Sequence, residues 1–266
     1  MYDRYNRKIN YLRVSVTDKC NLRCYYCMPE EGVKLLRHSD ILSYEEVTGV
    51  VRYGVQLGIN KVRLTGGEPL IRRDITRLVA MLASIPGIKD LSMSTNAQLL
   101  PEYAEDLVKA GLQRVNVSLD TLDIEKYSKI TRGGKLDQAL EGIEAARKAG
   151  LQPIKLNAVM NQYFDEEDRA ALENFASTHG YPLRFIREMD LEKGTFSVVE
   201  GGSGGDCRHC NRLRLTPNGQ LKPCLFSDLA YDVRELGIEK AYRLALENKP
   251  RSGSSNTSCT FYRMGG

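Results

Sequence analysis

The stretch Leu12-Arg-Val-Ser-Val-Thr-Asp-Lys-Cys20-Asn-Leu-Arg-Cys24-Tyr-Tyr-Cys27 joins the two features that decide the fold. Residues 12–17 alternate apolar and polar side chains, which predicts a strand. That strand runs directly into a Cys-x3-Cys-x2-Cys loop, where three thiols fall within eight residues. Three soft thiolate ligands so close together indicate a soft metal centre.

The loop offers one ligand fewer than a closed cluster needs. A cubane iron–sulfur cluster normally takes four cysteines, one for each iron. Cys20, Cys24 and Cys27 provide three, so one iron would keep an open position for a substrate or cofactor. The alternatives are a zinc knuckle, although structural zinc wants four closed ligands, and a set of buried free thiols. The spacing favours the open cluster.

Length and composition describe an ordinary globular protein. The 266 residues are 42% apolar and 27% charged, enough for one large domain or for a barrel with an appendage. No apolar run approaches the roughly 18 residues of a membrane span, and the polar N-terminus is unlike a signal peptide, so the cytoplasm is expected. A net charge of +4 is too weak to indicate nucleic acid. Six of the seven cysteines form two triplets, which indicates metal rather than disulfides.

Strand and helix patterns alternate along most of the chain. Strands are predicted at residues 12–17, 60–65, 88–94, 114–119, 154–159 and 183–186. Helices are predicted at residues 44–57, after a capping box formed by Ser43 and Glu46, and at 74–83, 101–111, 136–149, 166–178 and 238–247. Six alternations indicate a parallel α/β architecture with right-handed crossovers.

The position of the polar residues separates a barrel from an open twisted sheet. The residues that carry chemistry follow the predicted strands at their C-terminal ends: Cys20 to Cys27, Gly66 to Glu68, Ser94 to Asn96, Ser118 with Asp120, and Asn157. Barrels collect their chemistry on that face. Six units in place of eight predict a partial (β/α)6 TIM-type barrel that stays open at one side.

The pattern stops after Met189 and predicts three regions. Residues 1–196 form the partial barrel, residues 197–206 a Gly/Ser-rich linker, and residues 207–266 a small C-terminal iron–sulfur domain with a tail. Gly201-Gly-Ser-Gly-Gly205 has the composition of a flexible linker. A natural tether and an engineered join both remain open.

The Cys20–Cys27 loop resembles the cluster loop of the radical S-adenosylmethionine (SAM) enzymes, including Tyr26 directly before the third cysteine. The resemblance implies the same partial barrel and a 4Fe-4S cluster whose vacant iron holds the methionine end of SAM. It further implies that one electron from the cluster splits SAM into methionine and a 5′-deoxyadenosyl radical. The protein's own task is then positioning and exclusion.

The same resemblance implies a SAM pocket. In the family, the motif seen here as Gly66-Gly67-Glu68-Pro69 meets the SAM amino group, since glycines allow a close backbone approach and a carboxylate accepts charge-assisted hydrogen bonds. The other residues that the resemblance places at SAM are Tyr26, Ser94, Ser118, Asn157 and Met189. Taken singly, the serines are also ordinary strand-end hydroxyls and the methionine an ordinary core residue.

A second triplet, Cys207, Cys210 and Cys224, has the spacing Cys-x2-Cys-x13-Cys. Cys259 or His209 could complete a zinc site, so spacing alone leaves zinc and cluster open. The surrounding letters Cys210-Asn-Arg-Leu-Arg-Leu-Thr216, Gly219 and Pro223-Cys-Leu-Phe226 resemble the C-terminal cluster of the GTP 3′,8-cyclases, which begin molybdenum cofactor biosynthesis. That resemblance covers nearly the whole chain and implies a second 4Fe-4S cluster whose open iron holds the purine.

The implied reaction is hydrogen abstraction from the ribose C3′ of GTP, followed by attack of the carbon radical on C8 of guanine to give 3′,8-cyclo-7,8-dihydro-GTP. Arginine forks and lysine charges suit a triphosphate. The positions that match the family's catalytic residues are Cys20, Cys24, Cys27, Arg212 and Arg214. Those that match its GTP pocket are Arg13, Arg63, Ser94, Lys155, Arg184, Arg212 and Arg214, with the terminal Gly265 and Gly266, and Lys61 matches a further basic position of the family.

One departure is large: the family carries several tens of residues where this chain has only the Gly/Ser stretch. A shortened relative that acts on another nucleotide or a peptide is therefore an alternative, and a zinc-stabilised binding protein is a third. The resemblance implies GTP, a reducing electron donor and a downstream cyclic pyranopterin synthase as partners. It leaves a homodimer open, and neither nucleic acid nor a membrane is expected.

Overall fold

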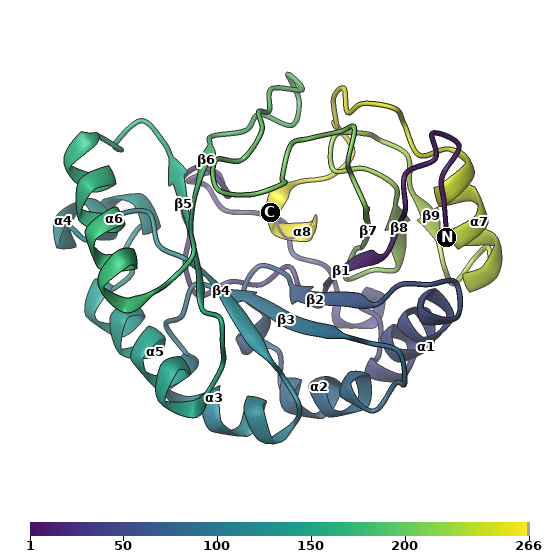
Figure 1. Cartoon of the computed structure of the whole chain (residues 1–266). Coiled ribbons are helices and arrows are strands. Elements are labelled where there is room, and N and C mark those ends of the chain that lie inside the picture. The colour runs from purple at the N-terminus through teal and green to yellow at the C-terminus, as the bar shows by residue number, and fades with distance from the viewer. Residues whose placement is uncertain (265–266) are drawn as a thin grey trace.

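The computed structural model describes residues 1–264, and within them nine strands form one curved sheet in the order β6-β5-β4-β3-β2-β1-β7-β8-β9 (Figure 1). The strands are β1 (Tyr11–Ser15), β2 (Lys61–Thr65), β3 (Asp90–Thr95), β4 (Arg114–Ser118), β5 (Lys155–Met160), β6 (Leu183–Arg187), β7 (Arg212–Leu215), β8 (Gln220–Lys222) and β9 (Tyr231–Asp232). The helices are α1 (Tyr44–Gln56), α2 (Ile75–Ala83), α3 (Leu100–Lys109), α4 (Ile124–Thr131), α5 (Leu136–Ala149), α6 (Glu166–His179), α7 (Ile238–Glu247) and α8 (Phe261–Met264).

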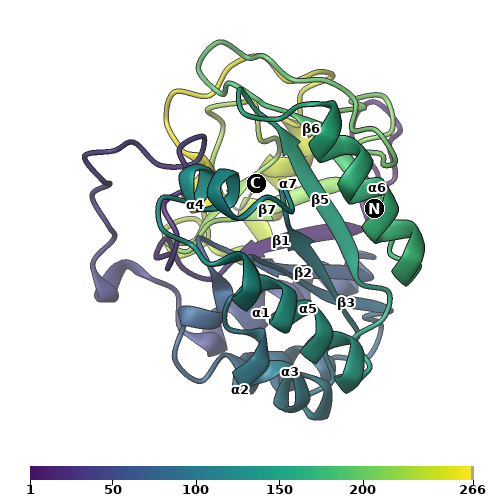
Figure 2. The same ribbon diagram turned by 90° about the vertical axis from the view of Figure 1, so that its left-hand side faces the viewer.

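The sheet is a partial barrel. Strands β1 to β6 pair in parallel in chain order, and β7 adds a further parallel strand on the other side of β1. The strands β8 and β9 continue antiparallel from there. Helices α1 to α6 lie outside the arc, and the short α8 lies inside it (Figures 1 and 2). The predicted open-sided (β/α)6 barrel is therefore confirmed.

Alternation along each strand separates a core face from a polar face. In β2, Val62 and Leu64 are fully buried in the main hydrophobic cluster, whereas Lys61, Arg63 and Thr65 line the inner cavity. The period of two places successive side chains on opposite faces. Apolar residues thus pack under the outer helices, and the interior of the arc is left for charged and polar groups.

The capping box predicted at α1 is confirmed. Ser43 Oγ accepts from the Glu46 backbone N–H at 3.1 Å, and the Glu46 carboxylate accepts from the Ser43 N–H at 2.7 Å. These bonds satisfy two backbone N–H groups that have no partner within the helix, which fixes where the helix starts.

Residues 207–264 add elements that the sequence patterns did not predict. Strand β7 joins the barrel sheet directly, because Leu12 lies in register with Leu213. Helix α7 was predicted, but β7, β8, β9 and α8 were not, and neither was α4 between β4 and α5.

Across residues 1–264, no helix has the length and apolar character needed to cross a membrane.

Candidate active site

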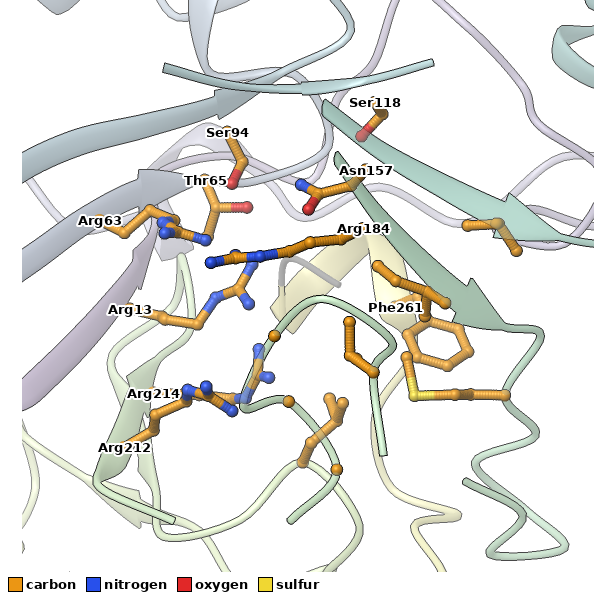
Figure 3. Close-up of a pocket in the computed structure, with 18 of the residues that line it drawn as sticks. Arg13, Arg63, Thr65, Ser94, Ser118, Asn157, Arg184, Arg212, Arg214 and Phe261 are labelled. Carbon is orange, nitrogen blue, oxygen red and sulfur yellow. The ribbon is translucent and has the colours of Figure 1, made fainter. Parts of the chain in front are cut away.

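Strand register brings three arginines into one row on the inner face of the barrel. Arg13 of β1 lies opposite Arg63 of β2 and opposite Arg214 of β7. In parallel strands, residues in register project to the same side. Figure 3 shows these three guanidinium groups along one wall of the cavity. Segments separated by some two hundred residues thereby form a continuous cationic surface.

A second row faces the first from the opposite side of the arc. Ser118, Asn157 and Arg184 are register neighbours on β4, β5 and β6. Figure 3 shows Asn157 and Arg184 directed into the same space as Arg13 and Arg63. The first wall therefore offers fixed positive charge, and the second offers hydroxyl and amide groups together with the charge of Arg184.

The two rows line a cavity of about 490 Å³. Every predicted site residue within residues 1–264 lines it: Arg13, Cys20, Cys24, Tyr26, Cys27, Arg63, Gly66, Gly67, Glu68, Ser94, Ser118, Lys155, Asn157, Arg184, Met189, Cys207, Cys210, Arg212, Arg214 and Cys224. Lys61 lines it as well. The strand-end reasoning thus gathers the residues correctly, whereas their individual roles remain predictions.

The arginines lie close enough to act on one another's charge. Burial lowers the pKa of Arg13, and the neighbouring guanidinium groups of Arg214 and Arg63 lower it further. Burial and the charge of Arg212 likewise lower the pKa of Arg214 to about 10. Desolvation and like charges both disfavour the charged form. An anionic ligand would relieve this repulsion, so the wall suits a polyanion such as a triphosphate.

The first cysteine triplet lies at the C-terminal end of β1, on the loop beside the cavity. Burial raises the pKa of Cys20 to about 11 and that of Cys27 to about 12, and burial with nearby charges raises the pKa of Cys24. Asn96 holds the loop: its Nδ2 donates to Asn21 Oδ1 at 2.8 Å and approaches Cys20 Sγ at 3.8 Å.

These thiols fit an iron–sulfur cluster with one open iron. Three soft donors of one type line one end of the cavity, and the cavity beside them leaves room for a cofactor. Over residues 1–264, no three His, Cys, Asp or Glu side chains are grouped so as to hold a single metal ion. Binding of the thiolates would release protons, because the free thiols are protonated at neutral pH.

The glycine motif packs against the cluster loop. A Cβ on Gly67 would collide with the carbonyl oxygen of Lys19, and one on Gly66 would lie 2.7 Å from the carbonyl oxygen of Thr17. Gly67 N–H also donates to the Thr17 carbonyl at 2.8 Å. Only glycine permits this approach. The motif therefore fixes the loop that carries the thiols.

Glu68 is already engaged within the protein. Its Oε1 accepts from Leu70 N–H at 3.1 Å and Thr95 Oγ1 at 2.9 Å, and its Oε2 accepts from Asn96 N–H at 2.8 Å. A carboxylate has about four acceptor positions, so roughly one is left for a ligand ammonium. Glu68 thus links the glycine motif to the loop after β3, which holds Asn96 against Cys20.

We predict a pH dependence of stability from this carboxyl. Burial raises the pKa of Glu68 to about 7 from an ordinary 4.5, although its hydrogen bonds act in the lowering direction. The folded chain then binds a proton that the unfolded chain has released, so stability falls as pH rises from about 4.5 to 7, by about 3 kcal/mol for this group. Urea unfolding of the metal-free chain at pH 5 and pH 8 measures the loss.

Glu68→Gln should flatten that slope, because an amide resembles the protonated acid in having one acceptor and one donor end. Burial also raises the pKa of Asp120, to about 6, and its contribution persists in both chains. The difference between the two slopes therefore isolates Glu68. Equal slopes in Glu68→Gln and the parent chain would contradict the assignment.

Tyr26 is tied to a second buried carboxyl. Its hydroxyl donates to Asp120 Oδ2 at 2.7 Å, and Asp120 Oδ1 accepts from the Val159 N–H at 2.8 Å. The loop after β4 and the strand β5 thus hold the aromatic ring that precedes the third cysteine. Position in sequence predicted a role for Tyr26 at SAM, but not this hydrogen bond.

The second triplet borders the same cavity from the β7 side. Cys207 and Cys210 precede β7, and Cys224 follows β8. Burial acts to raise the pKa of Cys210, but the charges of Lys249 and Arg212 outweigh it and lower that pKa. Arg212 and Arg214 lie on β7, close after Cys210 in the chain, and both line the cavity with the three cysteines.

The last described residues enter the barrel. Met264 is fully buried, and its carbonyl accepts from Arg214 Nη1 at 3.4 Å. Phe261 of α8 lines the cavity beside Arg184 (Figure 3). Gly265 and Gly266, which we predicted at the substrate, lie outside the described residues.

The Gly/Ser stretch follows the free edge of β6. Glu200 exchanges two backbone hydrogen bonds with Phe185, and Arg184 Nε donates to the Gly201 carbonyl at 3.3 Å. Gly201 has φ +74°, and a Cβ there would lie 2.6 Å from the Leu183 carbonyl oxygen. Glycine is thus required at this position by backbone conformation and close approach.

Sequence reasoning missed several residues that shape the cavity. Asn96 and Asp120 were noted only as strand-end residues, yet both hold the cluster loop. Arg114 forms a two-pronged pair with Asp90, at 2.7 and 2.9 Å, on the cavity wall. The sequence signal that could have predicted this pair is an aspartate and an arginine at the starts of two successive strands.

Comparison with known proteins defines the class. Residues 14–176 match the radical SAM superfamily, so the chain belongs to it. Its fold is like that of Streptococcus suis SuiB bound to S-adenosylmethionine, with TM-score 0.64 and 17% identity over 92% of this chain and 65% of that one. It is also like that of anSMEcpe with bound AdoMet, with TM-score 0.62 and 14% identity over 90% and 81% of the two chains.

Within the superfamily, the chain belongs to the GTP 3′,8-cyclase family. It is 41% identical to the GTP 3′,8-cyclase of Thermodesulfovibrio yellowstonii, over 89% of this chain and 88% of that one. It is 42% identical to the enzyme of Alkaliphilus oremlandii, over 88% and 86%. The first alignment runs over 282 positions, more than the 266 residues of this chain, so that relative carries additional residues inside the matched region. A chain that is shortened relative to its family would show this difference in length.

Proposed function

We propose that this chain is a radical SAM GTP 3′,8-cyclase, which converts GTP to 3′,8-cyclo-7,8-dihydro-GTP in the first step of molybdenum cofactor biosynthesis. The observation that carries the proposal is the register row of Arg63, Arg13 and Arg214, which faces a cavity bordered by both cysteine triplets. On this proposal, a polyanion bound along the row would lie between two sets of soft donors.

The first triplet would hold the 4Fe-4S cluster, and Gly66, Gly67 and Glu68 lie where the methionine end of SAM would bind. When bound, the cluster and SAM supply the 5′-deoxyadenosyl radical that abstracts the C3′ hydrogen. The chain's own residues orient the ribose toward that end of the cavity. Ser94, Ser118 and Asn157 offer hydroxyl and amide groups along the wall between the two ends.

The second triplet would hold a second 4Fe-4S cluster with an open iron for the purine. What supports it is the donor set: three cysteines border the cavity, and Arg212 and Arg214 follow Cys210 closely. Arg13, Arg63, Lys155 and Arg184 would bind the phosphates, since guanidinium forks pair with phosphate oxygens in bidentate fashion. On this proposal, residues 207–266 act as the unit that binds the purine.

The assay that tests the proposal is GTP-dependent formation of the cyclised nucleotide by the anaerobically reconstituted chain. Formation of that product with SAM and a chemical reductant is expected. Deoxyadenosine without a GTP-derived product would favour the alternative, a shortened relative with another nucleotide or a peptide as substrate. The electron donor, the downstream cyclic pyranopterin synthase, a homodimer and the cytoplasmic location remain proposals.

Cys259 should not be a cluster ligand. It packs near Phe226 and Met264, its backbone N–H donates to Asn256 Oδ1 at 3.1 Å, and it belongs to neither triplet. We expect Cys259→Ser to keep about eight irons per chain, the content of two cubanes. Iron and zinc analysis after anaerobic reconstitution checks this. Loss of half the iron, or stoichiometric zinc, would contradict it.

The terminal glycines should matter for product rather than for the clusters. Met264, the last described residue, accepts a hydrogen bond from Arg214 of the arginine row. A pair without side chains can enter a crowded pocket, and its carboxylate can pair with arginines. Deletion of Gly265 and Gly266 should leave the iron content and SAM cleavage without substrate unchanged while cyclisation is lost. A truncated chain that makes product at the full rate would show that the pair is only an end.

A further inference from the structure

Lys249 is a buried lysine just after α7, next to the second triplet. Its side chain is 1% exposed, and its Nζ donates to the carbonyl oxygen of Arg212 at 2.8 Å and to that of Pro223. The first carbonyl lies two residues after Cys210, and the second lies directly before Cys224. One ammonium group therefore ties together the two chain segments that carry these cysteines.

The charge of Lys249 has no carboxylate partner among residues 1–264, which sets it apart from Arg7, the cation that holds the Cys207 segment. Arg7 donates to the Cys207 carbonyl at 2.7 Å, but its own charge is paired with Asp3 at 2.6 Å. Arg7 thus anchors the first cysteine of the triplet with a neutralised pair. Lys249 anchors the segments of the other two with an unneutralised charge.

That charge lies beside the chain segments of two thiols, because its carbonyl partners belong to Arg212, two residues after Cys210, and to Pro223, directly before Cys224. A buried ammonium without a carboxylate is costly, and the two carbonyl oxygens account for two of its three donors. Three thiolates around a cubane carry net negative charge and would supply the missing partner.

We propose that Lys249 is a positioning residue of the second cluster, whose ammonium joins the Cys210 and Cys224 segments and supplies the positive charge that makes this cluster easier to reduce. The inference rests on the proposed two-cluster function. Reduction adds negative charge to a cluster, so a fixed cation beside it favours the reduced form. Second-sphere hydrogen bonds and charge are established determinants of cluster potential.

The test isolates the second cluster in the full-length chain. Cys20, Cys24 and Cys27 are replaced together by alanine, and the reconstituted chain is titrated with a reductant while electron paramagnetic resonance follows the reduced cluster. Into this background go Lys249→Met, Lys249→Arg and, as the matched control, Lys240→Met. Lys240 is exposed on α7, so its replacement removes the same charge far from the thiols.

At a fixed potential, Lys249→Met should lower the ratio of reduced to oxidised cluster about tenfold, a midpoint shift of about 59 mV for one electron. Lys249→Arg keeps the charge and Lys240→Met removes a remote one, so both should match the parent chain within about twofold. Lys249→Met with full iron and the midpoint of Lys240→Met would overturn the inference.

A second variant covers the case in which Lys249→Met does not bind the second cluster. If Lys249→Met holds no cluster, Lys249→Gln keeps a hydrogen-bond donor for the carbonyls without the charge and is titrated in the same way. A lowered midpoint there supports the inference, and an unchanged one overturns it. A chain with Lys249 intact that binds no iron at the second triplet overturns the two-cluster function, and this inference with it.

Discussion

Cys24→Ala should abolish reductive cleavage of SAM while the barrel remains folded. The substitution removes one of three thiol ligands, and no fourth cysteine lies in the loop to replace it. The turn itself does not depend on the thiol, because Cys27 and Met28 donate their backbone N–H groups to the Cys24 carbonyl at 2.9 and 3.0 Å. We expect no 5′-deoxyadenosine above background in a dithionite-driven assay.

The matched control is Cys259→Ala, which removes a thiol outside both triplets. It should form deoxyadenosine at the parent rate, and circular dichroism should show the same helix content in both variants. Near-normal deoxyadenosine from Cys24→Ala would contradict the assignment of the first cluster to this loop.

Arg214→Ala should weaken GTP binding strongly while the chain remains folded. A charge-assisted hydrogen bond is worth roughly 1.5–3 kcal/mol, which corresponds to about a 10- to 150-fold rise in the dissociation constant. Burial and the charge of Arg212 hold the pKa of Arg214 down, so this buried cation suits an anionic ligand. Arg212→Ala should weaken binding in the same range.

Calorimetric titration of the anaerobic protein with GTP measures the affinity, and a thermal scan without ligand measures stability. Arg243→Ala is the control, because Arg243 lies on the outer helix α7 and pairs there with Glu247 at 3.5 Å. Unchanged affinity in both Arg212→Ala and Arg214→Ala would favour a different substrate.

The main elements were predictable because their patterns are strong. Period-two alternation located β1 and β2 within two residues, and the capping box at Ser43 located the start of α1. Helix α4 was missed although Tyr127, Ile130 and Thr131 form its buried face, because its eight residues give only a short pattern. Asp123, which accepts from the Lys126 N–H at 2.7 Å, was an available start signal.

Strand β7 shows a different limit. Arg212-Leu-Arg-Leu215 alternates as clearly as β1, but its letters also belong to the cluster motif and were interpreted only in that way. Its pairing with β1 could not be predicted, since register between distant strands leaves no local pattern. The row of Arg63, Arg13 and Arg214 depends on that register.

The position of Lys249 beside the second triplet could not be predicted from the sequence. Nothing near it in the chain indicates a metal site, and it meets Arg212 across 37 residues. Only the packing of α7 against β8 and β9 brings it under the second triplet. Residues that hold ligands in place are thus harder to predict than the ligands, because their signal lies in tertiary contacts.

The most direct test of the proposed GTP 3′,8-cyclase reaction follows the hydrogen atom at the ribose C3′ of GTP. The reconstituted chain is given SAM, reductant and GTP carrying deuterium at the ribose C3′, and the 5′-deoxyadenosine is analysed by mass spectrometry. The account predicts that deuterium appears in the deoxyadenosine together with the cyclised nucleotide. Deoxyadenosine that forms without deuterium while GTP is recovered unchanged would contradict it.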